Sequence, residues 1–397
     1  MRIDILDGFR GWFLICMTMG HLALLLASGI GRRLNHQFGF PDVAQGFVLL
    51  SGLIIGIVYG RRLLTRSETS MRQSLFGRIR IIYRWHALLL IAIFACTLLW
   101  ADGLVHFLWG DLPTLSLALG LALLSGPMFI NILPMYILFM ALTPMALQAL
   151  RDGHERTLIL LSVSAWLVVQ FGLVDWVQSA IVAWTGLDDK RIEIGLYLDR
   201  LAWQPLYFGG LIAGMRVAQN RLDLSFVRTG AGAVLFAASL MVAGIILALT
   251  ILRNEGHLAR EGALMFDRLF ERRTLSILSL LEFLAAAYIA VWLLVAGDRS
   301  GSMLVRRIAS VFRAVVGWRP MIFLGRHSLS VYTWHVALCY VVMLGGWPWI
   351  RDTPILLREI LCVALTATLF LAGWLNARSA SGRAGGDKGA QLRTQPN

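Results

Sequence analysis

The chain has 397 residues, of which 58% are hydrophobic and 15% are charged, and its formal net charge is +13. Apolar runs of about 20 residues recur along the chain, which is the length a helix needs to cross a bilayer. This composition excludes a soluble globular domain. The positive charge does not indicate a nucleic-acid partner, because the basic residues stand in loops between the apolar runs, where the positive-inside rule accounts for them.

The apolar runs predict an all-α polytopic integral membrane protein with about ten transmembrane helices. We place these helices near residues 10–30, 43–60, 81–100, 133–150, 157–179, 203–218, 229–251, 275–296, 320–345 and 355–376. A further apolar stretch, 115–126, has only 12 residues and suits a re-entrant or interfacial segment better. The transmembrane domain then covers residues 1–376, and the Gly-, Ser- and Arg-rich tail 377–397 is expected to be disordered and cytoplasmic.

The distribution of charge among the loops predicts the topology. With ten spans, one side of the membrane holds the loops 61–84, 151–156, 216–228 and 298–319 and the tail. These segments carry 21 Lys and Arg against 6 Asp and Glu, whereas the loops opposite carry 11 against 12. Because basic loops stay in the cytoplasm, we expect both termini to be cytoplasmic. The first span lacks the cationic start of a signal peptide and is interpreted as a retained signal anchor.

The first span contains ionisable side chains that the bilayer core disfavours. It opens with Asp7 and Arg10 and places His21 near its middle, and such residues tend to face a cavity and have a function. Eleven residues make almost three helical turns, so Arg10 and His21 project from one face, and Asp7 can pair with Arg10 one turn later. The alternative is an interfacial arginine and a histidine held by a helix–helix hydrogen bond.

Other spans carry further polar candidates. The second span has Asp42 and Gln45 at its outer end and Ser51 near its middle, where packing between helices is the simpler role for Ser51. The ninth span adds Arg326, His327 and His335. The four cysteines all lie in apolar spans without metal-ligand spacing, so we interpret them as small buried hydrophobes and predict no metal site.

An arginine cluster precedes the third span. Arg78, Arg80 and Arg84 continue into the predicted helix, and His86 follows at the membrane edge. Positive-inside bias and attraction to anionic lipid explain part of this cluster. Guanidinium groups also match phosphate oxygens, so the cluster could bind a phosphate-bearing donor from the cytosol.

Six segments, in order over about residues 1–345, resemble the OpgC family. They are "ILDGFRGWFLICMTMGH", "FGFPDVAQGFVLLSGLIIGIVYGRR", "RIRIIYRWH", "NILPMYILFMALTPMALQALR", "LDRLAWQPLYFGGLIAGM" and "FLGRHSLSVYTWH". Members are multi-span inner-membrane proteins associated with succinylating osmoregulated periplasmic glucans, and they are related to a superfamily of membrane-bound acyltransferases. The recurrent residues of that superfamily fall here on Arg10 and His21, on Ser51 and Gly52, and on Arg78, Arg80 and Arg84.

The resemblance implies a bacterial inner-membrane O-acyltransferase. An acyl group, succinyl in the family, would pass from cytosolic acyl-CoA to a hydroxyl of an envelope or periplasmic carbohydrate. The implied catalytic residues are His21, Arg10 and Asp7, and the implied donor-binding residues are Arg78, Arg80, Arg84, His86 and Ser51. His21 would act either as a general base or as an acyl carrier. Acyl-CoA is then a co-substrate, no cofactor is bound permanently, and membrane lipid surrounds the protein.

Two other classes of function stay open. A transporter or flippase for a polar envelope molecule would also place charged residues among its helices, although it predicts inverted repeats and broken helices. An inactive relative that serves as a membrane scaffold is the other alternative. It is kept open by Gln45, because the family usually has an acid at this position. The sequence leaves the oligomeric state open.

Overall fold

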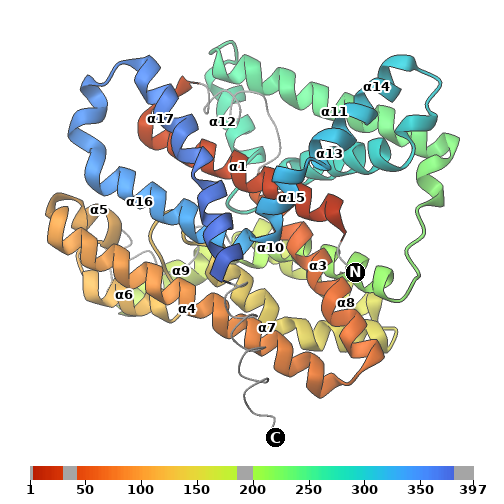
Figure 1. The fold of residues 1–397 in the computed structure, drawn as a ribbon, viewed down its shortest axis with the longest axis horizontal. Helices are drawn as coiled ribbons and strands as arrows, with labels where there is room; N and C mark the ends of the chain where they lie inside the picture. Colours follow the sequence, from red (N-terminus) through yellow and green to blue (C-terminus); the bar gives the residue numbers. More distant parts are fainter. Residues whose placement is uncertain (1–2, 30–42, 186–199, 380–397) are drawn as a thin grey trace, which may run out of the picture. The chain divides into compact units, whose positions relative to one another are not determined.

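The computed structural model describes residues 3–29, 43–185 and 200–379, and the described residues form helices and no strand (Figure 1). The chain divides into two compact units, one of residues 1–32 and 314–397 and the other of residues 33–313. The all-α polytopic fold expected from the sequence is confirmed. Asp42 and residues 380–397 of the predicted tail lie outside the described residues.

The first unit contains α1 (Asp4–Leu26), α15 (Arg319–Arg326), α16 (Ser328–Asp352) and α17 (Ile355–Ala367). The second contains α3 (Val43–Thr65), α4 (Glu68–Trp100), α5 (Val105–Trp109), α6 (Pro113–Leu121), α7 (Ile132–Arg151), α8 (Glu155–Gln170), α9 (Leu173–Thr185), α10 (Arg200–Ala218), α11 (Gly230–Asn254), α12 (Arg260–Leu269) and α13 (Ile277–Val295). The boundary between the units falls within α14 (Met303–Val316). Short 3-10 helices are η2 (Asp102–Leu104), η3 (Ser225–Arg228) and η4 (Gly297–Arg299).

Eight helices of the described chain are long and apolar enough to cross a bilayer, and the number rises to ten if each of two bent pairs is one span. The first pair, α8 with α9, is bent by 59° and coincides with the predicted span 157–179. The second pair, α14 with α15, is bent by 46°. In the stretch 115–126 the helix α6 has only nine residues and is too short to cross, as expected.

The sixth predicted span, 203–218, forms α10, which is not among the helices apolar enough to qualify. Instead α10 is buried against α3, where glycines allow the two backbones to touch. A Cβ added at Gly210 would overlap the carbonyl oxygen of Leu49, and one added at Gly52 would overlap that of Tyr207. A helix covered by protein in this way needs less apolar surface than one that faces lipid.

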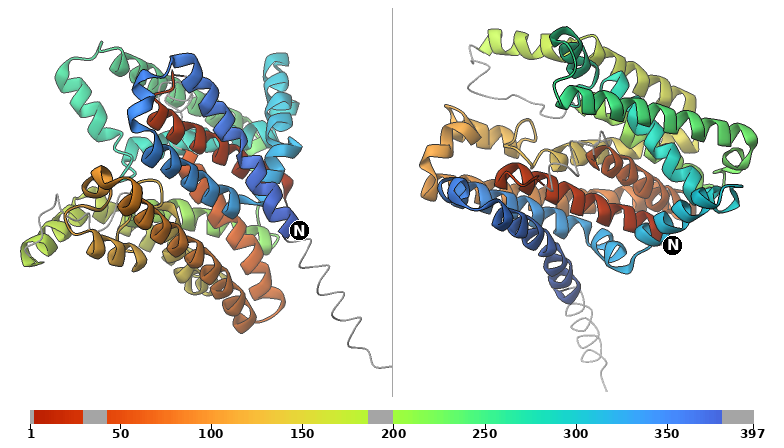
Figure 2. Two further views of the ribbon diagram at one scale, coloured as in Figure 1. Left: turned by 60° about the vertical axis from the view of Figure 1, so that its left-hand side comes forward. Right: turned by 90° about the horizontal axis from the view of Figure 1, so that it is seen from above.

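Close backbone contact also organises the first unit, in which α1 packs against α15, α16 and α17 (Figure 2). A Cβ at Gly11 of α1 would overlap the carbonyl oxygen of Met321, and one at Gly325 of α15 would overlap that of Asp7. These glycines bring α1 and α15 together, as small residues do in membrane helix pairs. The contact fixes the start of α1, which carries the ionisable residues.

Candidate functional site

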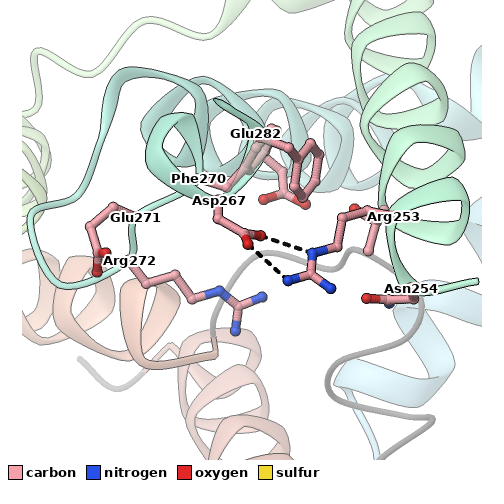
Figure 3. A pocket seen from close by; sticks show the side chains of 9 residues that line it. Arg253, Asn254, Asp267, Phe270, Glu271, Arg272 and Glu282 are labelled. Atoms are coloured by element: carbon pink, nitrogen blue, oxygen red, sulfur yellow. Dashed lines mark hydrogen bonds and ion pairs between the residues drawn. The ribbon is translucent and has the colours of Figure 1, made fainter. Parts of the chain in front are cut away.

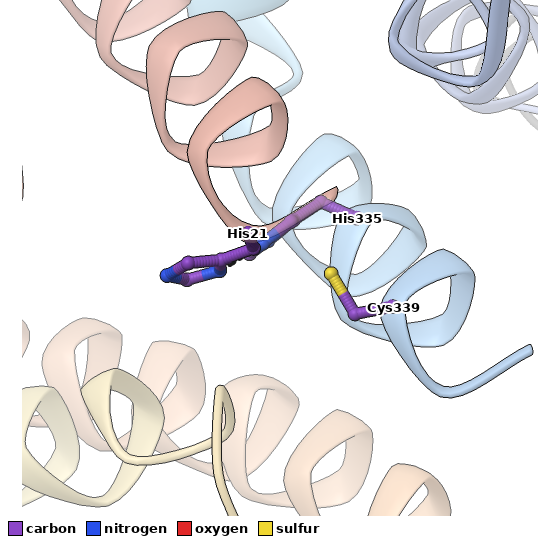
Figure 4. A group of neighbouring side chains, drawn as sticks. All are labelled: His21, His335 and Cys339. Carbon is purple, nitrogen blue, oxygen red and sulfur yellow. Dashed lines mark hydrogen bonds between the residues drawn. The ribbon is translucent and has the colours of Figure 1, made fainter. Parts of the chain in front are cut away.

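Within the first unit, α1 and α16 bring two histidines together (Figure 4). Nδ1 of His21 and Nε2 of His335 are 2.8 Å apart, a hydrogen-bond distance, and the ring centroids are separated by 5.0 Å. His335 is fully buried and His21 is half-buried. A neutral imidazole has one donor and one acceptor nitrogen, so one ring of the pair donates the shared proton and the other accepts it.

Arg10 contacts α16, the helix that His21 also contacts. Its Nη2 donates a hydrogen bond of 2.6 Å to the hydroxyl oxygen of Ser328. Ser328 stands seven residues before His335, which is about two helical turns, so the two α1 side chains meet one side of α16. These contacts place Arg10 and His21 on one face of α1, as their spacing predicts.

The acidic start of α1 is tied to α15 by Arg326. The guanidinium of Arg326 lies 2.7 Å from a carboxylate oxygen of Asp4 and 3.8 Å from one of Asp7. The expected pairing of Asp7 with Arg10 stays a prediction. His327, the next candidate, accepts at Nδ1 a hydrogen bond of 2.9 Å from the side-chain amide of Asn376. Arg326 and His327 therefore hold the helices of this unit together.

Cys339 lies next to the histidine pair, which the sequence did not reveal. Its sulfur and one ring nitrogen each of His21 and His335 lie within 4.8 Å of one another. These are ligand types that Zn²⁺ accepts, but two nitrogens on one tetrahedral zinc would be roughly 3.3 Å apart. Because Nδ1 of His21 and Nε2 of His335 are only 2.8 Å apart, the geometry of these two atoms fits a hydrogen bond between the rings. The spacing of four residues between His335 and Cys339 was the available signal.

The donor-binding candidates all belong to the second unit. Arg78 is half-buried on α4, and Arg80 and Arg84 are exposed. His86 is fully buried and donates from Nε2 to the carbonyl oxygen of Gly120 over 3.0 Å, which joins α4 to α6. Ser51 is buried on α3, and its hydroxyl has no hydrogen-bond partner among the described residues. The three arginines and these two residues therefore have different surroundings, and their shared role in donor binding stays a prediction.

The remaining candidate of the second span, Gln45, points to α13. Its amide nitrogen donates a hydrogen bond of 2.9 Å to the hydroxyl oxygen of Ser279, and both side chains are buried. Glu282, almost one turn further along α13, is also buried. Sequence reasoning missed Glu282, although an acid inside the apolar run 275–296 was a visible signal.

The comparison with known protein families gives one match. The family described as OpgC protein matches residues 2–381. No match was found among curated proteins or among solved structures. The match runs through both units and includes every candidate residue named above. The chain therefore belongs to the OpgC family.

Proposed function

We propose that this protein is a membrane-bound O-acyltransferase. It would transfer an acyl group, succinyl by analogy with the family, from cytosolic acyl-CoA to a hydroxyl of an envelope or periplasmic carbohydrate. Membership of the OpgC family supports transferase activity. The observation that carries the proposal is the hydrogen bond between His21 and His335, because ionisable residues inside membrane helices are rare and usually functional.

The pair suggests which nitrogen takes part in the reaction. The hydrogen bond engages Nδ1 of His21, so Nε2 of His21 is the nitrogen that would accept the proton of the acceptor hydroxyl. For Nε2 to accept a proton, Nδ1 must carry the ring hydrogen and donate it to Nε2 of His335. His335 is then a positioning residue that holds His21 in the tautomer of a general base.

Acyl transfer by this base proceeds in two proton movements. The acceptor hydroxyl oxygen attacks the thioester carbonyl carbon, a C–O bond forms, and the hydroxyl proton moves to Nε2 of His21. When the C–S bond breaks, the imidazolium returns this proton to the sulfur, which leaves an ester and free coenzyme A. While His21 is charged, its hydrogen bond to His335 is charge-assisted and therefore stronger than in the resting state.

The other candidates have supporting roles in this proposal. Arg78, Arg80 and Arg84 would bind the phosphates of acyl-CoA from the cytosolic side, since guanidinium groups pair well with phosphate oxygens. Arg10, fixed by its hydrogen bond to Ser328, would either hold the donor or orient the site through Asp7. Charge reversal at Arg80 or Arg84 should therefore weaken the binding of an acyl-CoA without lowering expression.

Substitution of His21 tests the proposal directly. His21→Gln keeps hydrogen-bonding capacity but cannot accept a proton near neutral pH, and His21→Ala loses both. Both variants should insert and purify as folded protein while acyl transfer, measured in membranes with equal amounts of protein, is abolished. Near-normal turnover by His21→Gln would exclude His21 as the catalyst. A transporter or an inactive scaffold would show no acyl transfer in the wild type either.

A further inference from the structure

The helix α14 has two apolar faces, and only one of them packs on protein. Its residues up to Arg313 belong to the second unit. One face packs on α13 and η3 through three apolar side chains, those of Val305, Ala309 and Phe312. The other face carries three apolar side chains that are 46–67% exposed, namely Leu304, Ile308 and Val311. About 100° of rotation around the helix separates the two faces, so the contact with α13 leaves the second face uncovered.

The composition of α14 suits a helix that lies along a membrane surface. By itself, α14 is not among the helices that are long and apolar enough to cross a bilayer, and a bend of 46° separates it from α15. The side of the helix opposite the exposed apolar face carries Arg306 and Arg313. An apolar face backed by arginines is typical of helices at the boundary between lipid headgroups and acyl chains. The loop 298–319, which contains α14, is expected on the cytoplasmic side.

Two of the three arginines of α14 are bound by the protein itself. Nη1 of Arg306 donates a hydrogen bond of 2.6 Å to the carbonyl oxygen of Ser300. The guanidinium of Arg313 lies 3.4 Å from a carboxylate oxygen of Asp298. Arg307 is exposed and has no hydrogen bond or ion pair to any residue that the structure describes. Its guanidinium is therefore available to a ligand from outside the chain.

The surroundings of Arg307 differ from those of an arginine that has a protein partner. At the polar cavity where α11 ends and α12 and α13 begin, Asp267 holds Arg253 through two hydrogen bonds of 2.9 and 2.8 Å (Figure 3). Arg307 instead has the exposed side chains of Leu304 and Val311 as its neighbours, one helical turn away on either side. A ligand that satisfies this part of α14 combines an anionic group with an apolar chain.

We propose that α14 lies on the cytoplasmic surface of the membrane and binds an anionic phospholipid there. Arg307 binds the lipid phosphate, because guanidinium groups match phosphate oxygens. The face formed by Leu304, Ile308 and Val311 lies against the acyl chains and is thereby removed from water. A free phosphate would satisfy Arg307 but would leave this face exposed. The proposal goes beyond the acyltransferase function and does not depend on it.

Photo-crosslinking from single positions of α14 tests this proposal on the full-length protein. The protein is reconstituted in nanodiscs made of equal parts of phosphatidylcholine and phosphatidylglycerol. A benzophenone amino acid replaces Val311 of the apolar face in one variant, and Ser310, which is also exposed but lies away from this face, in the matched control. After illumination, mass spectrometry should find lipid joined to position 311, with phosphatidylglycerol enriched over phosphatidylcholine. Position 310 should give at least tenfold less lipid product.

Substitutions of Arg307 test the headgroup contact in the variant that carries the benzophenone at position 311. Arg307→Gln should lower the enrichment of phosphatidylglycerol about fivefold, the effect of one basic residue near an anionic surface. Arg307→Lys retains the charge and should keep most of the enrichment. Arg268→Gln changes an exposed arginine of α12 and should leave the enrichment as it is.

Three results would overturn the proposal. A crosslink from position 311 to protein, in this chain or in a second copy, would replace lipid as the occupant of the apolar face. Equal lipid yields from positions 310 and 311 would show that α14 is surrounded by lipid, as in a span, and does not lie on the membrane surface. Equal enrichment of phosphatidylglycerol with Arg307 and with Arg307→Gln would exclude Arg307 as the headgroup ligand. None of these measurements requires acyl transfer, so failure of the proposed function would leave them valid.

Discussion

The hydrogen bond between His21 and His335 leads to a prediction that distinguishes a positioning role of His335 from a packing role. His335→Ala removes the acceptor of the His21 proton, so we expect kcat to fall by about 10²- to 10⁴-fold with little change in KM. The carbonyl oxygen of a glutamine can still accept this hydrogen bond, so His335→Gln should recover part of the lost kcat. Steady-state kinetics with a fixed acyl-CoA concentration would measure both effects.

Cys339 provides the control for this comparison. It is fully buried like His335 and lies one turn further along α16. A change in packing alone should therefore affect Cys339→Ala and His335→Ala similarly. If both variants lost thermal stability and activity in parallel, or if His335→Gln were no more active than His335→Ala, His335 would have only a structural role.

Asp267 of α12 is the residue where a dependence on pH is expected. Its hydrogen bonds to the Arg253 guanidinium lower the pKa of the Asp267 carboxyl below its ordinary value of 3.8. A lowered pKa means that the ion pair stabilises the contact between α11 and α12 above that ordinary value, and that this contribution is lost as the pH falls through the lowered pKa. Exposed ion pairs contribute little to stability, so the amides of α12 should exchange at most about fivefold faster at a pH below the lowered pKa than at neutral pH.

Hydrogen-exchange mass spectrometry, corrected for intrinsic exchange rates, would measure the change in α12. Asp267→Asn resembles the protonated acid and should show the faster exchange already at pH 7. Equal protection of α12 in the wild type and in Asp267→Asn at pH 7 would show that the ion pair does not hold this helix.

At the level of elements, the contact between α3 and α10 depends on glycine. Gly210 is buried with no room for a Cβ, whereas its neighbour Gly209 is exposed and has no atom within 4 Å of an added Cβ. Gly210→Ala should destabilise the protein by about 1–3 kcal/mol through overpacking. Gly209→Ala should be neutral or should stabilise the helix by up to about 1 kcal/mol. Thermal unfolding in detergent, followed by circular dichroism, would distinguish the two neighbours, and equal melting temperatures would contradict the close contact.

The elements also show what the sequence could predict. Helix positions and the shared face of Arg10 and His21 follow from local periodicity, and both were predicted. The partner of His21 stands 314 residues later in the chain, so periodicity could list His335 but could not pair the two. The burial of α10 was not predictable either, because it depends on glycines in α3 and α10 that face each other only after folding. Cys339 was interpreted as a small buried hydrophobe although His335 stands four residues before it, and Glu282 was passed over because no other charged residue stands in its apolar run.

For the whole molecule, α10 and α14 decide the topology. The ten-span arrangement predicted from the sequence needs α10 to cross the membrane, which its contact along α3 favours. A second ten-span arrangement leaves α10 out and counts the bent pair of α14 and α15 as a span. α14 has exposed apolar residues on one face, namely Leu304, Ile308, Val311 and Val315. Such a face suits either a span or a helix that lies on the membrane surface.

Tags in two loops distinguish these arrangements. If α10 crosses and α14 lies at the inner surface, a reporter inserted after Gly256 is external and one inserted after Gly301 is cytoplasmic. If α14 and α15 cross instead, both reporters change sides, because α11 and α13 then cross the membrane in the opposite directions. Reporters at Asp111 and after Asn397 should be external and cytoplasmic, respectively, in both arrangements, and so control for correct insertion. We expect the first result, because it keeps the arginine-rich loops in the cytoplasm. A cytoplasmic reporter after Gly256 would contradict this topology, while the base chemistry of His21 could still be tested by itself.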